Sequence, residues 1–135
     1  MSKAADSSIT IAALLADHPT HATAAEALAA CNATIAHAAV ETYGVLTRLP
    51  APHRVDAPTA ATVLKERTPM TYVTLDGSTY AKAPARLASA GISGGATYDG
   101  LIALAALEHN LVLFTSGRRA ERPYRALGVP YQLLA

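Results

Sequence analysis

Three acidic residues, Asp6, Glu41 and Asp99, have surroundings that suit a carboxylate with a chemical role. Asp6 ends a short extended run, Glu41 lies on a helical face of mostly small and apolar neighbours, and Asp99 opens a helix after the loop Gly91–Thr97. Each also has a structural explanation, because Asp6 could cap a helix and a helix dipole favours an acid at Asp99 by about 0.3–1 kcal/mol. If the fold brings them together, the three carboxylates need a counter-cation, and Mg²⁺ or Mn²⁺ is the hard ion that oxygen ligands prefer. The set therefore predicts a metal site that activates water and holds phosphates.

The elements that must position these acids alternate between strands and helices. We expect strands at Ser2–Asp6, Met70–Leu75, Leu111–Thr115 and Tyr131–Leu134, and helices at Ile9–Ala16, His21–Cys31, Thr34–Leu49, Ala57–Thr68, Thr79–Ala90, Tyr98–Asn110 and Arg119–Leu127. This alternation is typical of parallel strands joined by right-handed crossovers, and continuous apolar strands indicate helices on both faces of the sheet. Ligands in such folds bind outside the carboxyl ends of the strands, where Asp6 and the residues after the third expected strand lie.

Length, charge and cysteine content argue against a multidomain chain, a globally basic nucleic-acid-binding protein and a disulfide-linked protein. The 135 residues are expected to form one domain, and a net charge of +1 gives no global basic field for nucleic acid. The single cysteine, Cys31, excludes an internal disulfide and suits a reducing cytoplasm. The longest apolar runs, Ile9–Ala16 and Leu101–Leu107, are far shorter than the ~20 residues of a membrane span. We therefore expect a cytoplasmic protein with no membrane partner.

Four segments together resemble the PIN-domain family, in particular the VapC-type toxins of bacterial toxin–antitoxin pairs. They read DSSITIAALLADHPTH, AHAAVETYGVLTRLP, GGATYDGLIALAALEHNLVLFTSGRRA and YRALGVPYQLL. The resemblance covers essentially the whole chain and keeps the order and spacing of the segments. It implies a three-layer α/β/α PIN-like domain around a central, mostly parallel twisted sheet. It also implies that Asp6, Glu41 and Asp99 are catalytic residues that hold Mg²⁺ or Mn²⁺.

One position departs from the family pattern. The family's fourth acid usually lies in a turn similar to T-x-D-R-R-A, and here the third residue of that turn is Gly117. This departure puts a second metal ion and the full catalytic rate in question. The hydroxyls of Thr115 and Ser116 are auxiliary candidates for the water shell of a metal or for a phosphate.

The resemblance predicts a metal-dependent endoribonuclease toxin that cleaves structured RNA such as tRNA or rRNA. It further implies a homodimer and inhibition by a VapB-type antitoxin. Because of Gly117, the alternative is a catalytically weakened PIN-fold protein that still binds RNA or a protein partner. A nucleotide- or flavin-binding domain is less well supported, because the chain lacks a G-x-G-x-x-G or Walker-type loop.

Basic residues concentrate near the end of the chain, at Arg118, Arg119, Arg122 and Arg125. Three of them, all except Arg119, are spaced to share one face of the expected helix. Next to an acidic metal site, this face could bind RNA phosphates, which dominate the affinity of proteins for nucleic acids. A solvated helix face is the other interpretation, and the sequence leaves both open.

Overall fold

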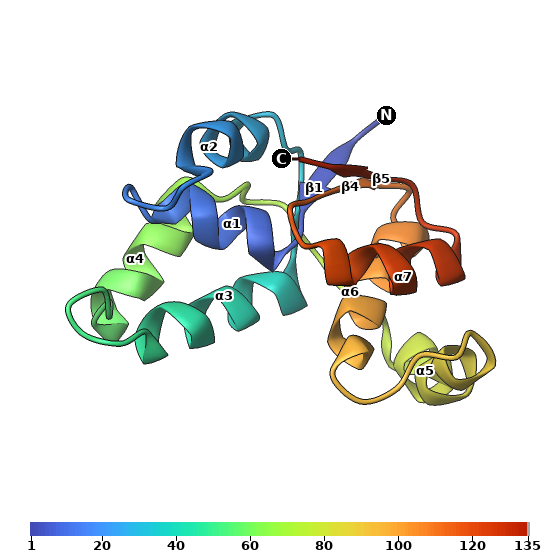
Figure 1. Cartoon of the computed structure of the whole chain (residues 1–135). Helices are drawn as coiled ribbons and strands as arrows, with labels where there is room; N and C mark the ends of the chain where they lie inside the picture. The colour runs from blue at the N-terminus through green and yellow to red at the C-terminus, as the bar shows by residue number, and fades with distance from the viewer. Residues whose placement is uncertain (135) are drawn as a thin grey trace.

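The computed structural model describes residues 1–134, in which two helices follow each of the first three strands and one helix follows β4 (Figure 1). The strands are β1 Lys3–Ala5, β2 Thr34–Ile35, β3 Tyr72–Val73, β4 Val112–Thr115 and β5 Tyr131–Leu133. The helices are α1 Ser7–Leu14, α2 His21–Ala29, α3 Ala36–Arg48, α4 Ala57–Arg67, α5 Gly77–Ser89, α6 Ala96–Glu108 and α7 Arg118–Leu127.

All strand pairs are parallel. One sheet has the order β1-β4-β5, with Ala5 opposite Phe114, and the second consists of β2 and β3. Lys3 and Asn32 join the two sheets, because the Asn32 N–H donates to Lys3 O at 2.8 Å and the Lys3 N–H donates to Asn32 Oδ1 at 2.9 Å. The expectation of a mostly parallel sheet is therefore confirmed.

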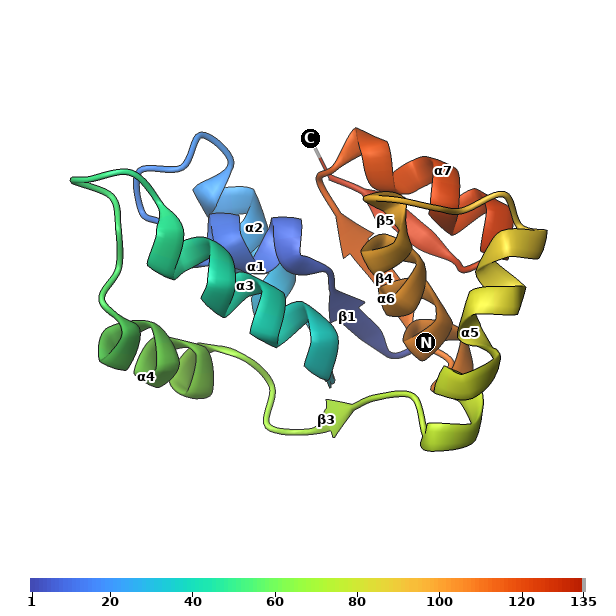
Figure 2. The same cartoon turned by 90° about the horizontal axis from the view of Figure 1, so that it is seen from below.

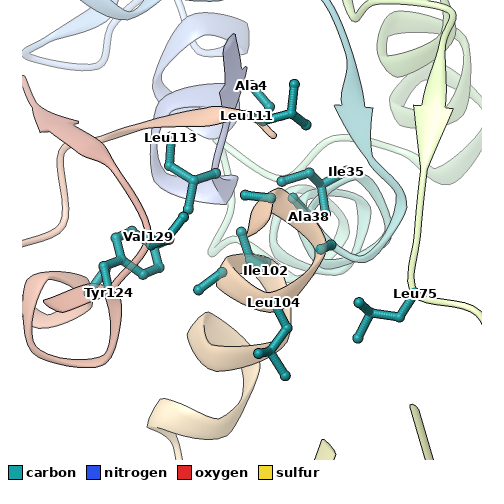
Figure 3. Packing of buried hydrophobic residues seen from close by; sticks show 14 of the residues in the cluster. Ala4, Ile35, Ala38, Leu75, Ile102, Leu104, Leu111, Leu113, Tyr124 and Val129 are labelled. Carbon is teal, nitrogen blue, oxygen red and sulfur yellow. The ribbon is translucent and has the colours of Figure 1, made fainter. Parts of the chain in front are cut away.

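Two apolar cores cover the two faces of the three-stranded sheet. Ala5 and Phe114 belong to the core formed with α1 and α2, whereas Ala4 and Leu113 belong to the core formed with α6 and α7. Neighbouring residues of a strand point to opposite faces, so this division shows a helix–sheet–helix arrangement. Figure 3 shows the second core, in which Leu113 lies near other labelled side chains of α6 and α7. The predicted three-layer α/β/α fold is confirmed.

Two strand predictions need correction. Thr34 and Ile35 were expected at the start of a helix but form β2, and α3 begins at Ala36. A two-residue strand has no periodicity to detect, and Thr34 gains its pairing from Tyr72 on the neighbouring strand. The expected buried strand Met70–Leu75 contains only the two residues of β3, and Tyr72 is 51% exposed. Its sheet has only two strands, so β3 is an edge strand, and Figure 2 shows it on the segment that runs from α4 to α5.

Local sequence signals fix the helix ends near the site. Asp6 caps α1 by accepting from the backbone N–H groups of Ser8 and Ile9. Gly128 ends α7 in a left-handed conformation with φ of 73°, which glycine adopts without strain. Gly100 lies against α5, and a Cβ there would be only 2.5 Å from Leu87 Cδ2. Close packing at Gly100 fixes the first turn of α6, which carries Asp99.

No helix within residues 1–134 combines the length and the apolar character needed to cross a membrane.

Candidate active site

Asp6 lies at the carboxyl end of β1, where the backbone pairing with β4 continues. Its N–H donates to Phe114 O at 3.0 Å, and only 2% of its surface is exposed. Carboxylate oxygen Oδ1 accepts from Ser8 N at 3.1 Å, from Ile9 N at 3.4 Å and from the Ser8 hydroxyl. Burial raises the pKa of Asp6, and the hydrogen bonds that it accepts oppose that rise. The start of α1 therefore holds this carboxylate in one orientation.

Tyr124 of α7 contacts the other oxygen of the same carboxylate. Its hydroxyl donates to Asp6 Oδ2 at 2.7 Å, and its side chain is fully buried. Burial, followed by the negative charge of Asp6, raises the pKa of Tyr124, so the phenol keeps its proton and remains a donor. Both oxygens of Asp6 thus have fixed partners, one from α1 and one from α7.

Glu41 lies on α3 and has a less satisfied carboxylate. Its Oε1 atom is buried and has no hydrogen-bond partner among residues 1–134. One turn earlier, His37 stacks on Tyr98 of α6, with ring centroids 5.7 Å apart and planes inclined by 3°. The stack joins α3 to the first turn of α6, which places Glu41 on the same side of the fold as Asp99.

Asp99 lies close enough to the other two acids for their charges to affect it. Its pKa is raised to about 6, first by burial and then by the negative charges of Asp6 and Glu41. A carboxyl group with such a pKa is partly protonated near neutrality unless a cation offsets the neighbouring charges. The fold therefore brings the three acids of the sequence prediction into one region.

A corner of hydroxyl groups adjoins Asp6 at the end of β4. Thr115 is fully buried; its Oγ1 lies 3.4 Å from Ser8 Oγ and accepts from Gly117 N at 3.1 Å. Ser8 Oγ also accepts from Ser116 N at 3.0 Å. The backbone of the Thr115–Gly117 turn is thereby fastened to the residues that cap α1. Of the two auxiliary residues expected from the sequence, Thr115 lies beside Asp6, whereas Ser116 contacts Ser8 through its backbone N–H.

The four arginines do not form one patch. All four are exposed. Arg118 lines a cleft beside Ser8 and Ser116, whereas Arg122 lines a separate pocket with the loop before α6. Arg125 is engaged elsewhere: its Nη2 lies 3.2 Å from Glu121 Oε1, and its Nε donates to the Tyr131 hydroxyl at 2.9 Å.

Of these arginines, Arg118 is therefore the one that lines a cleft together with Ser8, whose hydroxyl contacts Asp6. It makes no ion pair with the described part of the chain.

The residues present fit a hard divalent cation in chemistry. The donors are carboxylate oxygens, the buried Glu41 Oε1 lacks a partner among residues 1–134, and the negative charges of Asp6 and Glu41 add to burial in raising the pKa of Asp99. Within residues 1–134, however, no three acid, imidazole or thiol groups converge closely enough to enclose an ion. Charges act over longer distances than metal–ligand bonds. The acids can therefore affect the pKa of Asp99 without lying close enough to enclose an ion. Binding an ion would require Glu41 and Asp99 to turn towards the fixed Asp6.

Sequence reasoning missed Tyr124 and underused Ser8. The sequence predicts a possible helix cap at Asp6, and a hydroxyl two residues after a capping acid, here that of Ser8, can also bond the side chain of that acid. No local signal identifies Tyr124, because it lies in a polar helix and its partner is 118 positions away. Only the assembled fold shows that contact.

Comparison with known proteins agrees with this geometry. A model of the PIN domain matches residues 4–126. Ribonuclease VapC40 of Mycobacterium tuberculosis strain CDC 1551 is 39% identical over 131 residues, which cover 97% of this chain and 98% of that protein. Ribonuclease VapC27 of strain H37Rv is 41% identical over 127 residues, or 93% and 92% of the two chains. The chain belongs to the PIN-domain family, and the relatives that it resembles there are VapC ribonucleases.

Proposed function

We propose that this protein is a metal-dependent endoribonuclease of the VapC toxin type that cuts structured RNA, such as tRNA or rRNA. One observation carries the proposal: three carboxylates share a region at the carboxyl end of the parallel sheet, and the pKa of one of them, Asp99, is raised to about 6 by burial and then by the negative charges of Asp6 and Glu41. Nuclease sites need this concentration of negative oxygen ligands. The names of the relatives support the same reaction class.

Asp6, Glu41 and Asp99 would hold Mg²⁺ or Mn²⁺. A divalent ion bound there would activate water for attack and neutralise charge on the phosphate. Asp6 supplies the fixed ligand, since Ser8 and Tyr124 hold both of its oxygens in place. Glu41 supplies a buried oxygen that is free to bind, and Asp99 loses its remaining proton when positive charge arrives.

The resemblance to VapC-type proteins also supports a set of partners. We include in the proposal a VapB-type antitoxin that blocks the acidic site, a homodimer, and a cytoplasmic location.

The test incubates the purified chain with a pool of structured cellular RNA in Mn²⁺, in Mg²⁺ and in EDTA. The variant Asp99→Asn removes one acid, and Asp76→Asn is the matched control because Asp76 is an exposed helix cap far from the site in sequence. Discrete fragments should appear with Mn²⁺ or Mg²⁺ for the wild type and the control only. Intact RNA from a folded wild-type chain at every metal concentration would contradict the proposal.

A second candidate, a PIN-fold interaction protein with little catalysis, is favoured by Gly117 and by the lack of three converging ligands among the described residues. It predicts that Gly117→Asp raises metal affinity and cleavage. The geometry allows this variant, because a Cβ at position 117 would come no closer than 3.7 Å to Thr115 Oγ1. Unchanged metal affinity and cleavage in Gly117→Asp would remove the basis of this candidate.

A further inference from the structure

A cleft of about 610 Å³ opens next to the acids, between α1, the start of α7 and the end of β5. Ser8 forms the border, because its hydroxyl contacts Asp6 while its side chain also lines the cleft. Ile11 and Leu133 supply apolar surface, and Arg118 supplies a positive charge. A mixed apolar and polar lining of this size is typical of sites for small organic groups.

The described residues that line the cleft include no acid. Besides Arg118, the lining contributes the hydroxyl group of Ser116, and His18 lies on the wall formed by the loop after α1. The Ser8 hydroxyl also lines the cleft, but its proton is already donated to Asp6. His18 Nδ1 accepts from Thr20 N at 3.2 Å, so the ring proton is on Nε2, which can donate. Donors and one unpaired guanidinium suit an anion, in contrast to the neighbouring group of three carboxylates.

Gly117 connects these two environments. A Cβ at this position would lie 3.7 Å from Thr115 Oγ1 and 4.0 Å from Ser8 Oγ, so a side chain there would begin beside the residues that contact Asp6, at the lining of the cleft. An aspartate would put a negative charge beside Arg118. Glycine leaves the mouth of the cleft open and uncharged.

We propose that this cleft binds one nucleotide of the RNA substrate next to the cleaved bond, with its phosphate at Arg118 and its base against the apolar wall. The inference rests on the proposed ribonuclease function and gives Gly117 a role within it. Loss of the fourth acid removes a potential metal ligand and makes the adjoining space acceptable to a phosphate. In this arrangement the protein lacks a ligand for a second metal ion but binds the RNA substrate more tightly.

The experiment measures binding of a short, labelled single-stranded RNA in EDTA, so that affinity is read without cleavage. Gly117→Asp and Gly117→Asn differ by one charge at nearly equal size, and the extended backbone of residue 117 (φ −91°, ψ 109°) accepts both. Gly117→Asp should weaken binding about fivefold relative to Gly117→Asn, as expected for one unit charge at about 4 Å in water.

Arg118→Ala provides the second arm. It should lower the slope of log affinity against log salt by about 0.7, the value for one lost phosphate contact on a single strand. Arg86→Ala, an exposed arginine of α5 outside the cleft, should keep the wild-type slope.

Equal affinities for the two Gly117 variants, or a wild-type salt slope for Arg118→Ala, would overturn the inference. The ribonuclease proposal fails separately: it fails if the wild type cleaves no RNA with Mn²⁺, even when RNA binding in EDTA depends on Arg118. Cleavage with Mn²⁺ together with unaltered binding by the Gly117 and Arg118 variants would contradict the phosphate site alone.

Discussion

The two sides of the acidic region are built differently. On the sheet side, Asp6 is 2% exposed and both of its oxygens accept hydrogen bonds, from α1 and from Tyr124. On the helix side, Glu41 has a buried oxygen without a partner among residues 1–134, and Asp99 is only partly buried. Asp6 is therefore a fixed anchor, whereas Glu41 and Asp99 hold negative charge that the described chain does not compensate.

This difference matches what the proposed metal site would require. Asp6 is oriented in advance by the chain, which would lower the cost of ordering it if an ion bound. Glu41 and Asp99 keep free oxygens and mutual repulsion, which an ion would relieve. Each of the following variants changes one side of this contrast.

The largest effect is expected from Glu41→Gln. The amide keeps the size of the side chain but removes the charge and one oxygen ligand, so RNA cleavage with Mn²⁺ should fall on the order of a hundredfold or more. Glu66→Gln, at an exposed glutamate of α4, is the matched control and should cleave as the wild type does. Wild-type rates in Glu41→Gln would show that the unpartnered oxygen has no role in the reaction.

An intermediate effect is expected from Tyr124→Phe, which removes the hydrogen bond that holds Asp6 Oδ2 in place. Loss of the hydroxyl leaves Asp6 Oδ2 buried without its donor and should lower the free energy of unfolding by about 1–3 kcal/mol. Mn²⁺ affinity, measured by electron paramagnetic resonance of the free ion, should fall roughly tenfold.

Tyr131→Phe removes a hydroxyl that bonds Glu121 and Arg125 instead, and it should leave Mn²⁺ affinity unchanged. If Tyr124→Phe loses stability but binds Mn²⁺ as the wild type does, Tyr124 supports the fold and does not orient Asp6 for metal.

The smallest effect is a gain of stability in Asp99→Asn, measured in EDTA. The pKa of Asp99 in the folded state, about 6, lies above its ordinary value of 3.8, so the folded chain holds this proton more tightly than the unfolded chain. Stability therefore falls as pH rises from about 4 to 6, and the ionised group destabilises the fold above pH 6. Asp99→Asn should stabilise the protein at pH 8 by roughly 1 kcal/mol, after allowance for screening of a half-exposed group.

The gain in stability of Asp99→Asn should disappear below pH 4, where the side chain at position 99 is neutral in the wild type and in the variant. Asp56→Asn should change stability in the opposite direction, because hydrogen bonds from Thr59 lower the pKa of Asp56 and thereby stabilise the fold above pH 4. Chemical denaturation at pH 3.5, 6 and 8 measures the free energy of unfolding of the wild type and of both variants. Loss of stability in Asp99→Asn at pH 8 would contradict the picture of uncompensated charge.

The fold could be predicted from sequence wherever a local signal was strong. Pro58 at the start of α4, Asp76 before α5 and Gly128 after α7 each act on the backbone of the adjoining helix end. The position of that helix end can therefore be predicted from the local sequence. Strand β2 could not be predicted, because Thr34 and Ile35 become a strand only through pairing with β3.

The same limit applies to the site. Asp6 and Asp99 were identifiable by type, spacing and resemblance, because both lie at element ends where an acid has a local signature. The contact of Tyr124 with Asp6 and the separation of Arg118 from Arg122 depend on how α7 packs. A helical wheel places those arginines on one face, but neighbouring elements divide that face between two pockets.

The long sequence separation between Asp6 and Tyr124 has a consequence for synthesis. Strand β1 pairs with β4, and Asp6 gains its last hydrogen bond from α7, so the N-terminal acid has no stable position until the end of the chain has been made. Glu41 and Asp99 likewise lack their neighbour until then. We therefore expect a nascent chain that still lacks α7 to be inactive towards the RNA around it. The acidic region gains its complete set of contacts only once Tyr124 has been made and α7 has packed beside β1.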